Sequence, residues 1–321
     1  MKKYKLSICI PARNEMFLAR TVQDILEHKE DDTEIIIGLD GKWADPVIPQ
    51  HPDVSVIYVP ESVGQRLATR LCVNLSKAKY IIKCDAHVSF DQGFDRKMLE
   101  LFAEVGDDVT AVPIMNNLHV YDWKCMKCGH KEYQDRVDIC PKDGEKMTKK
   151  MIWEPRRGVH STAYCFDSQP HFQYHSALKE REEYKRDKEE KGYTETMNLQ
   201  GSFFMMTREK YLELIDDSVG SWGSQAIQVA CATWLSGGRV LVNHKTHYAH
   251  CFRTKPNFGF PYPLSGREVK KTKDTVRDLF WQGKHPKQIR PVSWLVEKFA
   301  PVPGWSEEDL TKLKDSEKNF L

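Results

Sequence analysis

The sequence contains no long run of apolar residues. Nowhere do its 321 residues approach the roughly 18 consecutive apolar residues that span a bilayer, and the stretch MKKYKLSICIPARNE becomes polar too early for a secretory signal. These absences predict a cytoplasmic protein without membrane contact. The chain also lacks an excess of charge of one sign, since its 48 Lys and Arg nearly balance its 46 Asp and Glu and leave a net charge of +2. This balance argues against a general coat for nucleic acid but permits a local basic face.

The nine cysteines are an odd number, so a complete disulfide framework is not expected in a cytosolic chain. The sequence shows no internal repeat, and its length allows one large or two ordinary domains, each with its own core. No G-x-G-x-x-G motif follows the first predicted strand. Its absence argues against a nucleotide-binding oxidoreductase.

Short β-rich apolar runs alternate with amphipathic stretches over the first hundred residues. Apolar residues at helical spacing predict helices over 14–28 and 63–77. The alternation predicts an α/β fold with a mostly parallel, Rossmann-like central sheet, which binds ligands beyond the carboxyl ends of its strands. The predicted strands are Lys5–Ile10, Glu34–Leu39, Val54–Tyr58, Tyr80–Cys84 and Val109–Ile114.

Regular structure is expected to resume after an irregular middle. Residues 156–193 are rich in aromatics and histidines and end in a charge run, Lys179–Lys191, which is typical of a solvated helix or a mobile loop and less often of a partner contact. A strand, two helices, a strand and a last helix are then predicted before a Pro- and Trp-rich tail. They are Ser202–Met206, Arg208–Ile215, Gln225–Ser236, Arg239–Asn243 and Val269–Trp281.

The strongest chemical signal is the triplet Asp85-Ala86-His87, directly after a predicted strand. A carboxylate and an imidazole two residues apart at a strand end can reach one divalent ion and leave other positions for phosphate oxygens. The triplet alone is a weak signal, because an acid and a histidine after a strand can simply cap the next turn.

Other segments resemble glycosyltransferases with the GT-A fold, of the family-2-like superfamily. The opening SICIPARNE resembles their first strand and loop, and Asp40 stands where such enzymes hold an acid against uracil. The stretch from Gly64 through Arg66 to His87 resembles the one before their metal motif.

The closer resemblance is to the polypeptide N-acetylgalactosaminyltransferases, which carry D-A-H where most GT-A enzymes carry D-x-D. Their later blocks read approximately W-G-G-E-N, W-x-C-G-G and G-H-x-F-R. This chain matches them in order and without gaps by WGSQA from Trp222, WLSGG from Trp234 and AHCFR from Ala249. The resemblance covers roughly residues 5–115 and 197–282.

The resemblance implies a metal-dependent transferase that uses a nucleotide sugar, UDP-linked. Asp85, His87 and His250 would hold Mn²⁺ or Mg²⁺, and Arg253 would meet the diphosphate. A divalent ion and a guanidinium stabilise the charge left on the diphosphate without proton transfer. Without the match in register, a polar core or surface role would be preferred for His250. The further residues expected to bind the donor are Pro11, Ala12, Arg13, Glu15, Asp40, Gly64, Arg66, Gly201 and Trp222.

One departure concerns Gln225, a catalytic candidate that stands at the acid of W-G-G-E-N. An inverting transferase needs a carboxylate base, which a glutamine cannot be, so the change favours the retaining mechanism that the resemblance implies. Under another alignment Asp216 or Asp217 could supply a base, and Gln225 could instead hydrogen-bond a sugar hydroxyl. Gly201 could simply be a turn glycine before a strand, without a role in donor binding. Trp222 could fill the core instead of stacking on a sugar.

A short cysteine-containing segment interrupts the pattern in the middle of the chain. Cys125-x-x-Cys128-Gly and Cys140-Pro-x-x-Gly have the shape of two zinc-ribbon knuckles, but the fourth cysteine is missing. Asp143 or His130 could complete a zinc shell, and a degenerate ribbon with free thiols is the alternative. With few large apolar groups the segment could not fold alone, and zinc could supply roughly 10 kcal/mol of order.

The expected organisation is a nucleotide-sugar-binding half (1–115), a zinc-ribbon-like insertion (116–150), an acceptor and catalytic half (151–260) and a C-terminal helical extension (261–321). The insertion lies outside the family pattern and has a small excess of lysine. Because zinc ribbons often contact nucleic acid, a hydroxymethylated base in DNA, as in phage DNA hypermodification, is a hypothesis for the acceptor, although the local excess of positive charge is small. A protein or glycan acceptor stays open, as does an inactive GT-A domain that acts as a zinc-dependent binding module. The sequence leaves the donor sugar and the oligomeric state open.

Overall fold

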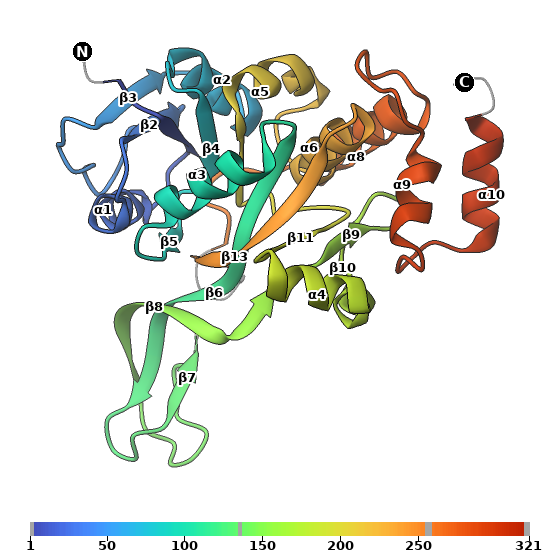
Figure 1. Cartoon of the computed structure of the whole chain (residues 1–321). Coiled ribbons are helices and arrows are strands. Elements are labelled where there is room, and N and C mark those ends of the chain that lie inside the picture. Colours follow the sequence, from blue (N-terminus) through green and yellow to red (C-terminus); the bar gives the residue numbers. More distant parts are fainter. Residues whose placement is uncertain (1–2, 134–136, 254–258, 318–321) are drawn as a thin grey trace.

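A mixed β-sheet with helices on both faces forms the body of the protein, as the computed structural model shows for residues 3–133, 137–253 and 259–317 (Figure 1). Most neighbouring strands of the body run parallel, whereas β12 lies antiparallel between β4 and β6. Across the sheet the order is β11 (Tyr193–Glu195), β13 (Arg239–His250), β6 (Val109–Cys125), β12 (Phe203–Thr207), β4 (Tyr80–Cys84), β1 (Leu6–Ala12), β2 (Thr33–Asp40) and β3 (Val54–Val59).

Helices bury both faces of this sheet. α1 (Leu18–His28) and α3 (Phe94–Val105) pack on one face, where apolar residues at helical spacing, such as Leu18, Val22 and Ile25, enter the core. The other face is covered by α2 (Gln65–Leu75), α5 (Arg208–Leu214), α6 (Gln225–Leu235) and α8 (Gly266–Trp281). Strands buried on both sides read as nearly continuous apolar runs, which is why the sequence predicted them well.

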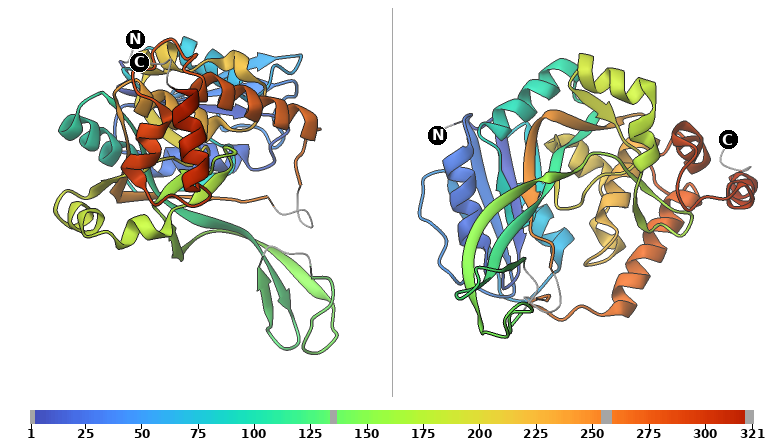
Figure 2. Two further views of the ribbon diagram at one scale, coloured as in Figure 1. Left: turned by 90° about the vertical axis from the view of Figure 1, so that its right-hand side faces the viewer. Right: turned by 90° about the horizontal axis from the view of Figure 1, so that it is seen from below.

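Helix α6 is apolar nearly all round and almost entirely buried. The reason is its position between the sheet and the C-terminal helices α8 and α9 (Val292–Phe299), with α10 (Glu307–Ser316) packed on α9. Figure 2 shows these last helices side by side at one end of the body. Among the described helices, none has the length and apolar character needed to cross a membrane.

A two-stranded arm projects from the body (Figures 1 and 2). Strand β6 extends beyond the sheet into the arm, where it pairs antiparallel with β8 (Met147–Ser161). Near the tip of the arm, β6 also pairs antiparallel with β7 (Lys131–Tyr133). We call the described residues between 117 and 156 the arm. The expected insertion boundaries at 115–116 and 150–151 therefore fall inside β6 and β8, and the expected end of this strand at Ile114 is too early.

Smaller elements complete the chain. The charge run forms an exposed helix, α4, as the solvated-helix alternative expected, and Tyr184 anchors it by donating a hydrogen bond to Thr162 Oγ1 (2.8 Å). The predicted helices are confirmed within a few residues. Helix α3 and the tail helices α9 and α10 were not predicted, and β13 continues seven residues beyond the expected end at Asn243. The remaining elements are β5 (Val88–Phe90), β9 (Tyr164–Phe166), β10 (Phe172–Tyr174), the 3₁₀ turns η1 (Ser176–Glu180) and η2 (Asp217–Val219), and α4 (Glu182–Glu190).

Candidate functional site

The Asp85-Ala86-His87 triplet and His250 meet because β13 pairs with the short strand after the triplet. His250 stands opposite Val88 in the antiparallel pairing of β13 with β5. The backbone N–H of Cys251 donates to the carbonyl of His87 (3.0 Å), which closes the register. Residues far apart in the sequence thus share one end of the sheet.

These three side chains converge on one point. Nε2 of His250 lies 3.3 Å, and Nε2 of His87 3.8 Å, from Oδ2 of Asp85. One donor atom from each residue lies within 4.8 Å of the others. Adjacent ligands of an octahedral ion are about 3 Å apart, so the spacing suits a divalent cation with positions left for other ligands.

The chemistry of the three donors also fits a metal ion. Within the described part of the chain, Nδ1 of the buried His250 has no hydrogen-bond partner, and its Nε2 faces Asp85 at 3.3 Å. Burial lowers the pKa of His250 and keeps its ring neutral, the form that binds metals. Burial alone would raise the pKa of Asp85, but the Lys83 ammonium and both histidines hold that pKa well below its ordinary value.

Glu15 and Arg253 form an ion pair beside this group. A guanidinium nitrogen of Arg253 contacts Oε2 of Glu15, and the same oxygen lies 3.4 Å from Nδ1 of His87. Burial would raise the pKa of Glu15, but His87 and Arg253 outweigh it and lower the pKa. A second nitrogen of Arg253 donates to the carbonyl of Gly259 (3.0 Å) and ties the C-terminal segment to the site.

A cavity of about 890 Å³ opens beside these residues. Its volume lies at the upper end of the range for small-molecule sites. It is lined by most of the residues that the sequence predicted for donor binding, metal binding or catalysis: Pro11, Ala12, Arg13, Glu15, Asp40, Gly64, Asp85, His87, Gly201, Trp222, Gln225, His250 and Arg253.

Arg66 is the exception to this convergence. It is fully buried beneath the cavity wall, and its guanidinium donates to Gln228 Oε1 (2.8 Å) and to the carbonyls of Gly220 (3.1 Å) and Gly223 (2.5 Å). The expectation of a direct donor contact at Arg66 is not supported. Arg66 instead supports the loop that carries Trp222 and leads into α6.

Asp40 and Gly64 form another part of the cavity wall. Asp40 accepts hydrogen bonds from Ser62 Oγ (2.8 Å) and from the backbone N–H groups of Val63 (2.6 Å) and Gly64 (3.1 Å). Gly64 has φ +87°, and a Cβ there would lie 2.6 Å from the side chain of Ser221. Only a glycine fits at this closed turn before α2.

Two buried amides face the cavity from the turn before β12 and from the start of α6. Gln225 begins α6, and within the described residues both atoms of its side-chain amide lack hydrogen-bond partners, as does Nε2 of Gln200. Buried amides without partners are uncommon in folded proteins and are satisfied when a polar ligand is bound. The alternative bases lie elsewhere: Asp217 contacts Arg70, Asp216 accepts from Ser218, and neither lines the cavity.

A second group of metal-ligating residues lies at the tip of the arm. Donor atoms of Cys125, Cys128, Cys140 and Asp143 all lie within 4.8 Å of one another. The Cys128 and Cys140 sulfurs are 3.6 Å apart, close to the about 3.8 Å expected for two thiolates on tetrahedral zinc. His130 is not part of this group, because its Nε2 lies 2.8 Å from Glu132 Oε1.

Both halves of the arm tip fold as tight turns. The N–H of Gly129 donates to the carbonyl of Cys125, and the N–H of Gly144 donates to the carbonyl of Cys140, each over 3.0 Å. Gly129 and Gly144 have φ near +70°, which favours glycine. The two predicted knuckles are present, and their geometry favours Asp143 over His130 as the fourth ligand.

Sequence reasoning missed several residues of the site. Lys83 is fully buried and contacts Asp85, and the available signal was a lysine inside an otherwise apolar strand. His171, Tyr262 and Lys273 line the cavity from segments outside the aligned motifs or without a distinctive pattern. No spacing rule would have found these three.

Comparisons with known proteins agree with the geometry. Residues 7–124 match the family described as glycosyl transferase family 2. A Drosophila melanogaster protein assigned as polypeptide N-acetylgalactosaminyltransferase 13 is 22% identical over 312 residues, covering 91% of this chain and 48% of its own length. Polypeptide N-acetylgalactosaminyltransferase 3 of the same organism is 28% identical over 72 residues, covering 22% of this chain and 11% of its own. The chain therefore spans at most about half the length of these relatives.

A solved structure shares the fold. The crystal structure of GalNAc-T7 with UDP, GalNAc and Mn²⁺ matches with a TM-score of 0.65 at 15% identity, over 97% of this chain and 54% of that one. The sheet order and the covering helices are those of a GT-A fold. Residues 7–124 thus match glycosyl transferase family 2, and the chain has the GT-A fold and is similar to the polypeptide N-acetylgalactosaminyltransferases.

Proposed function

We propose that this protein transfers a sugar from a UDP-linked donor to a hydroxyl acceptor, with Mn²⁺ or Mg²⁺ held by Asp85, His87 and His250. The observation that carries the proposal is the convergence of these ligands and Arg253 on one large cavity, within a chain whose residues 7–124 match glycosyl transferase family 2. The metal would supply Lewis-acid stabilisation of the departing diphosphate.

The chain's own residues supply the remaining chemistry. The Arg253 guanidinium, held by Glu15, faces the cavity and would bind the diphosphate as charge develops on it. The Gln225 amide and Nε2 of Gln200, which lack hydrogen-bond partners among the described residues, would hydrogen-bond hydroxyl groups of the donor sugar. Trp222 contacts Phe260 edge to face (5.5 Å) at the cavity wall, where an aromatic surface can stack on a sugar.

Retention of the anomeric configuration is part of the proposal. Among the described residues that line the cavity, the carboxylates are Glu15, Asp40 and Asp85. Glu15 is paired with Arg253, Asp40 with its turn, and Asp85 with Lys83 and the metal position. None is left as a base for an acceptor hydroxyl, which favours proton transfer to the departing phosphate on the same face.

Release of UDP tests the enzyme proposal directly. UDP formation would be followed with Mn²⁺ across UDP-glucose, UDP-galactose and their N-acetyl forms, in the wild type and in Asp85→Ala. Retention would be read from the anomeric NMR signals of the product. Absence of UDP release with every donor, together with unchanged donor binding in Asp85→Ala, would contradict the proposal and favour an inactive GT-A domain that serves as a binding module.

We propose hydroxymethylated DNA as the acceptor, and the arm supports this choice. It carries the exposed lysines Lys127, Lys131, Lys142, Lys146 and Lys150, placed on a hairpin that stands clear of the body. Neighbouring acids, such as Glu145 beside Lys127 (2.8 Å), keep the local charge excess small. Transfer to duplexes with and without 5-hydroxymethylcytosine separates this acceptor from a protein or a glycan, for which a denatured protein mixture and free sugars are the matched substrates.

Zinc bound by Cys125, Cys128, Cys140 and Asp143 completes the proposed cofactor set. The purified protein would contain one zinc per chain by elemental analysis, and Cys128→Ser would lose it. His130→Ala is the matched control, because His130 lies beside the site but pairs with Glu132. Zinc loss in His130→Ala with retention in Asp143→Ala would reverse the choice of the fourth ligand.

A further inference from the structure

Lys83 is a fully buried lysine in the middle of the central sheet. It lies on β4 opposite Cys9 of β1 and Phe204 of β12. An ammonium group in such a place costs free energy unless it is paired and hydrogen-bonded. Lys83 meets both conditions, because its Nζ donates to Oδ1 of Asp85 (2.5 Å) and to the carbonyl of Gly201 (2.6 Å).

This contact gives the two oxygens of the Asp85 carboxylate different partners. Oδ1 is held by Lys83, whereas Oδ2 faces His250 at 3.3 Å and His87 at 3.8 Å. One oxygen therefore stays oriented toward the metal position. The second bond of Lys83 ties the same orientation to Gly201 at the cavity wall.

The two carboxylates beside the metal position are already paired with cations. Lys83 forms an ion pair with Asp85, and Arg253 forms one with Glu15. A divalent cation adds two positive charges a few ångströms from an ammonium group that is shielded from water. The diphosphate of a nucleotide sugar brings the negative charge that offsets them.

We propose that Lys83 is a positioning residue that aims Asp85 and makes divalent-ion binding depend on the diphosphate of the donor. This inference rests on the proposed function of the site. The ion and the nucleotide then bind as a coupled pair, and by thermodynamic linkage each strengthens the binding of the other. The fold thereby disfavours a site that is loaded with metal but without donor.

Mn²⁺ affinity in Lys83→Met, with and without UDP, tests the proposal. Removing the charge should tighten binding of Mn²⁺ alone by about tenfold or more, and should shrink the gain in Mn²⁺ affinity that UDP produces. Free Mn²⁺ would be followed by electron paramagnetic resonance. A purely structural role for Lys83 predicts the opposite sign, since a disturbed Asp85 binds the ion less well.

The melting temperature gives a second measurement. Lys83→Met leaves a carboxylate without its partner, so Mn²⁺ should raise the melting temperature of the variant more than that of the wild type. Lys83→Gln keeps amide donors for Asp85 and Gly201 but removes the charge. It should show the same tightening, which keeps the test usable if Lys83→Met does not fold.

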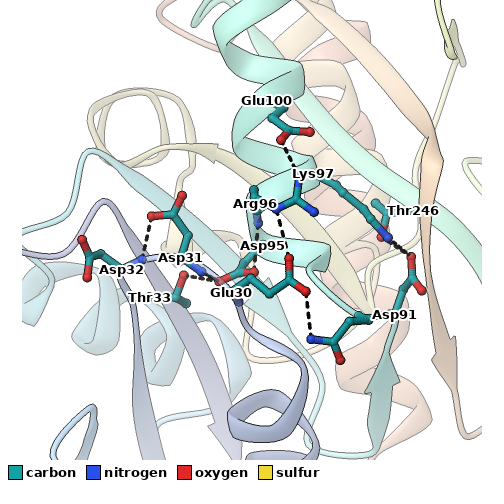
Figure 3. Close-up of polar contacts among 11 residues, drawn as sticks. Glu30, Asp31, Asp32, Thr33, Asp91, Asp95, Arg96, Lys97, Glu100 and Thr246 are labelled. Atoms are coloured by element: carbon teal, nitrogen blue, oxygen red, sulfur yellow. Dashed lines mark hydrogen bonds and ion pairs between the residues drawn. The ribbon is translucent and has the colours of Figure 1, made fainter.

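Lys97→Met is the matched control. Lys97 also bonds an aspartate that follows a strand, Asp91 (2.6 Å), but Lys97 lies on α3, and the residues labelled in the polar network of Figure 3 include none of the metal ligands. Its Mn²⁺ affinity should equal that of the wild type. Unchanged or weaker Mn²⁺ binding in folded Lys83 variants, or an equal effect in Lys97→Met, overturns the inference while leaving the proposed function intact. A wild type that binds no Mn²⁺ even with UDP overturns both.

Discussion

The two groups of metal-ligating residues in this chain are built in opposite ways. Asp85, His87 and His250 come from the ends of two strands that are far apart in the sequence, and the sheet brings them together. Cys125, Cys128, Cys140 and Asp143 lie close in sequence, on two tight turns at the tip of the arm. One group depends on the tertiary fold, whereas the other is nearly local.

The two groups also differ in the chemical type of their ligands. Three nitrogen and oxygen donors suit a hard or borderline ion that keeps open positions for exchangeable ligands. Three thiolates and a carboxylate make a closed tetrahedral set, which is typical of a structural site. The body has a large core of its own, whereas the small core at the arm tip contains two of the ligands, Cys125 and Cys140, packed with Met147. The body should therefore fold without metal, but the arm tip should not.

Zinc removal should produce the largest effect and sharpen this contrast. A chelator should abolish amide-exchange protection of the arm tip, since zinc supplies roughly 10 kcal/mol of order to such small folds. Protection of the body strands should stay within about threefold. Hydrogen-exchange mass spectrometry reports both regions in one experiment, and equal loss in body and arm would contradict the separation.

Removal of the Asp85 carboxylate should have the next largest effect. Asp85→Ala should reduce transfer by about 10³-fold, because it removes a metal ligand next to the developing charge on the diphosphate. Asp91→Ala is the control, since Asp91 also follows a strand but pairs with Lys97. Rates of UDP release measure both, and a reduction below tenfold in Asp85→Ala would break the assignment of this group to the chemistry.

Replacement of Asp143, the proposed oxygen ligand of the arm, should have a smaller effect and should strengthen metal binding. Asp143→Cys completes a four-thiolate set, and we expect zinc affinity to increase by about tenfold, because zinc accepts thiolate ligands more readily than a carboxylate. Competition with a chromogenic chelator measures the change. An Asp143→Cys variant with weaker zinc binding would show that Asp143 is not a ligand.

The smallest effect should come from Lys149, which belongs to the arm but not to its metal group. Its ammonium lies 3.6 Å from the ring centroid of Tyr121 and 5.8 Å from that of Trp123. Lys149→Met should destabilise the zinc-loaded arm by about 0.5–1 kcal/mol. Exchange rates of arm amides should increase by less than about tenfold, and those of the body should not change.

The sequence predicted the mostly parallel α/β body well because its strands are apolar on both faces and its helices are amphipathic. The family resemblance added the GT-A assignment and the metal ligands Asp85, His87 and His250. The sequence located the arm within a few residues but did not predict that β6 and β8 continue into it, because strands exposed to solvent lack a clear apolar pattern. It assigned Arg66 to the donor, although this residue supports a loop from below.

The sequence by itself determined which chemistry is present: a D-x-H motif with a later histidine, and two cysteine knuckles. These are properties of residue type and local spacing. Only the tertiary structure decided that Lys83 holds Asp85, that His250 stands beside His87, and that His130 lies outside the zinc group. The physical reason is that strand register and side-chain direction, which set distances of a few ångströms, arise from packing across the whole sheet and are not encoded in any short segment.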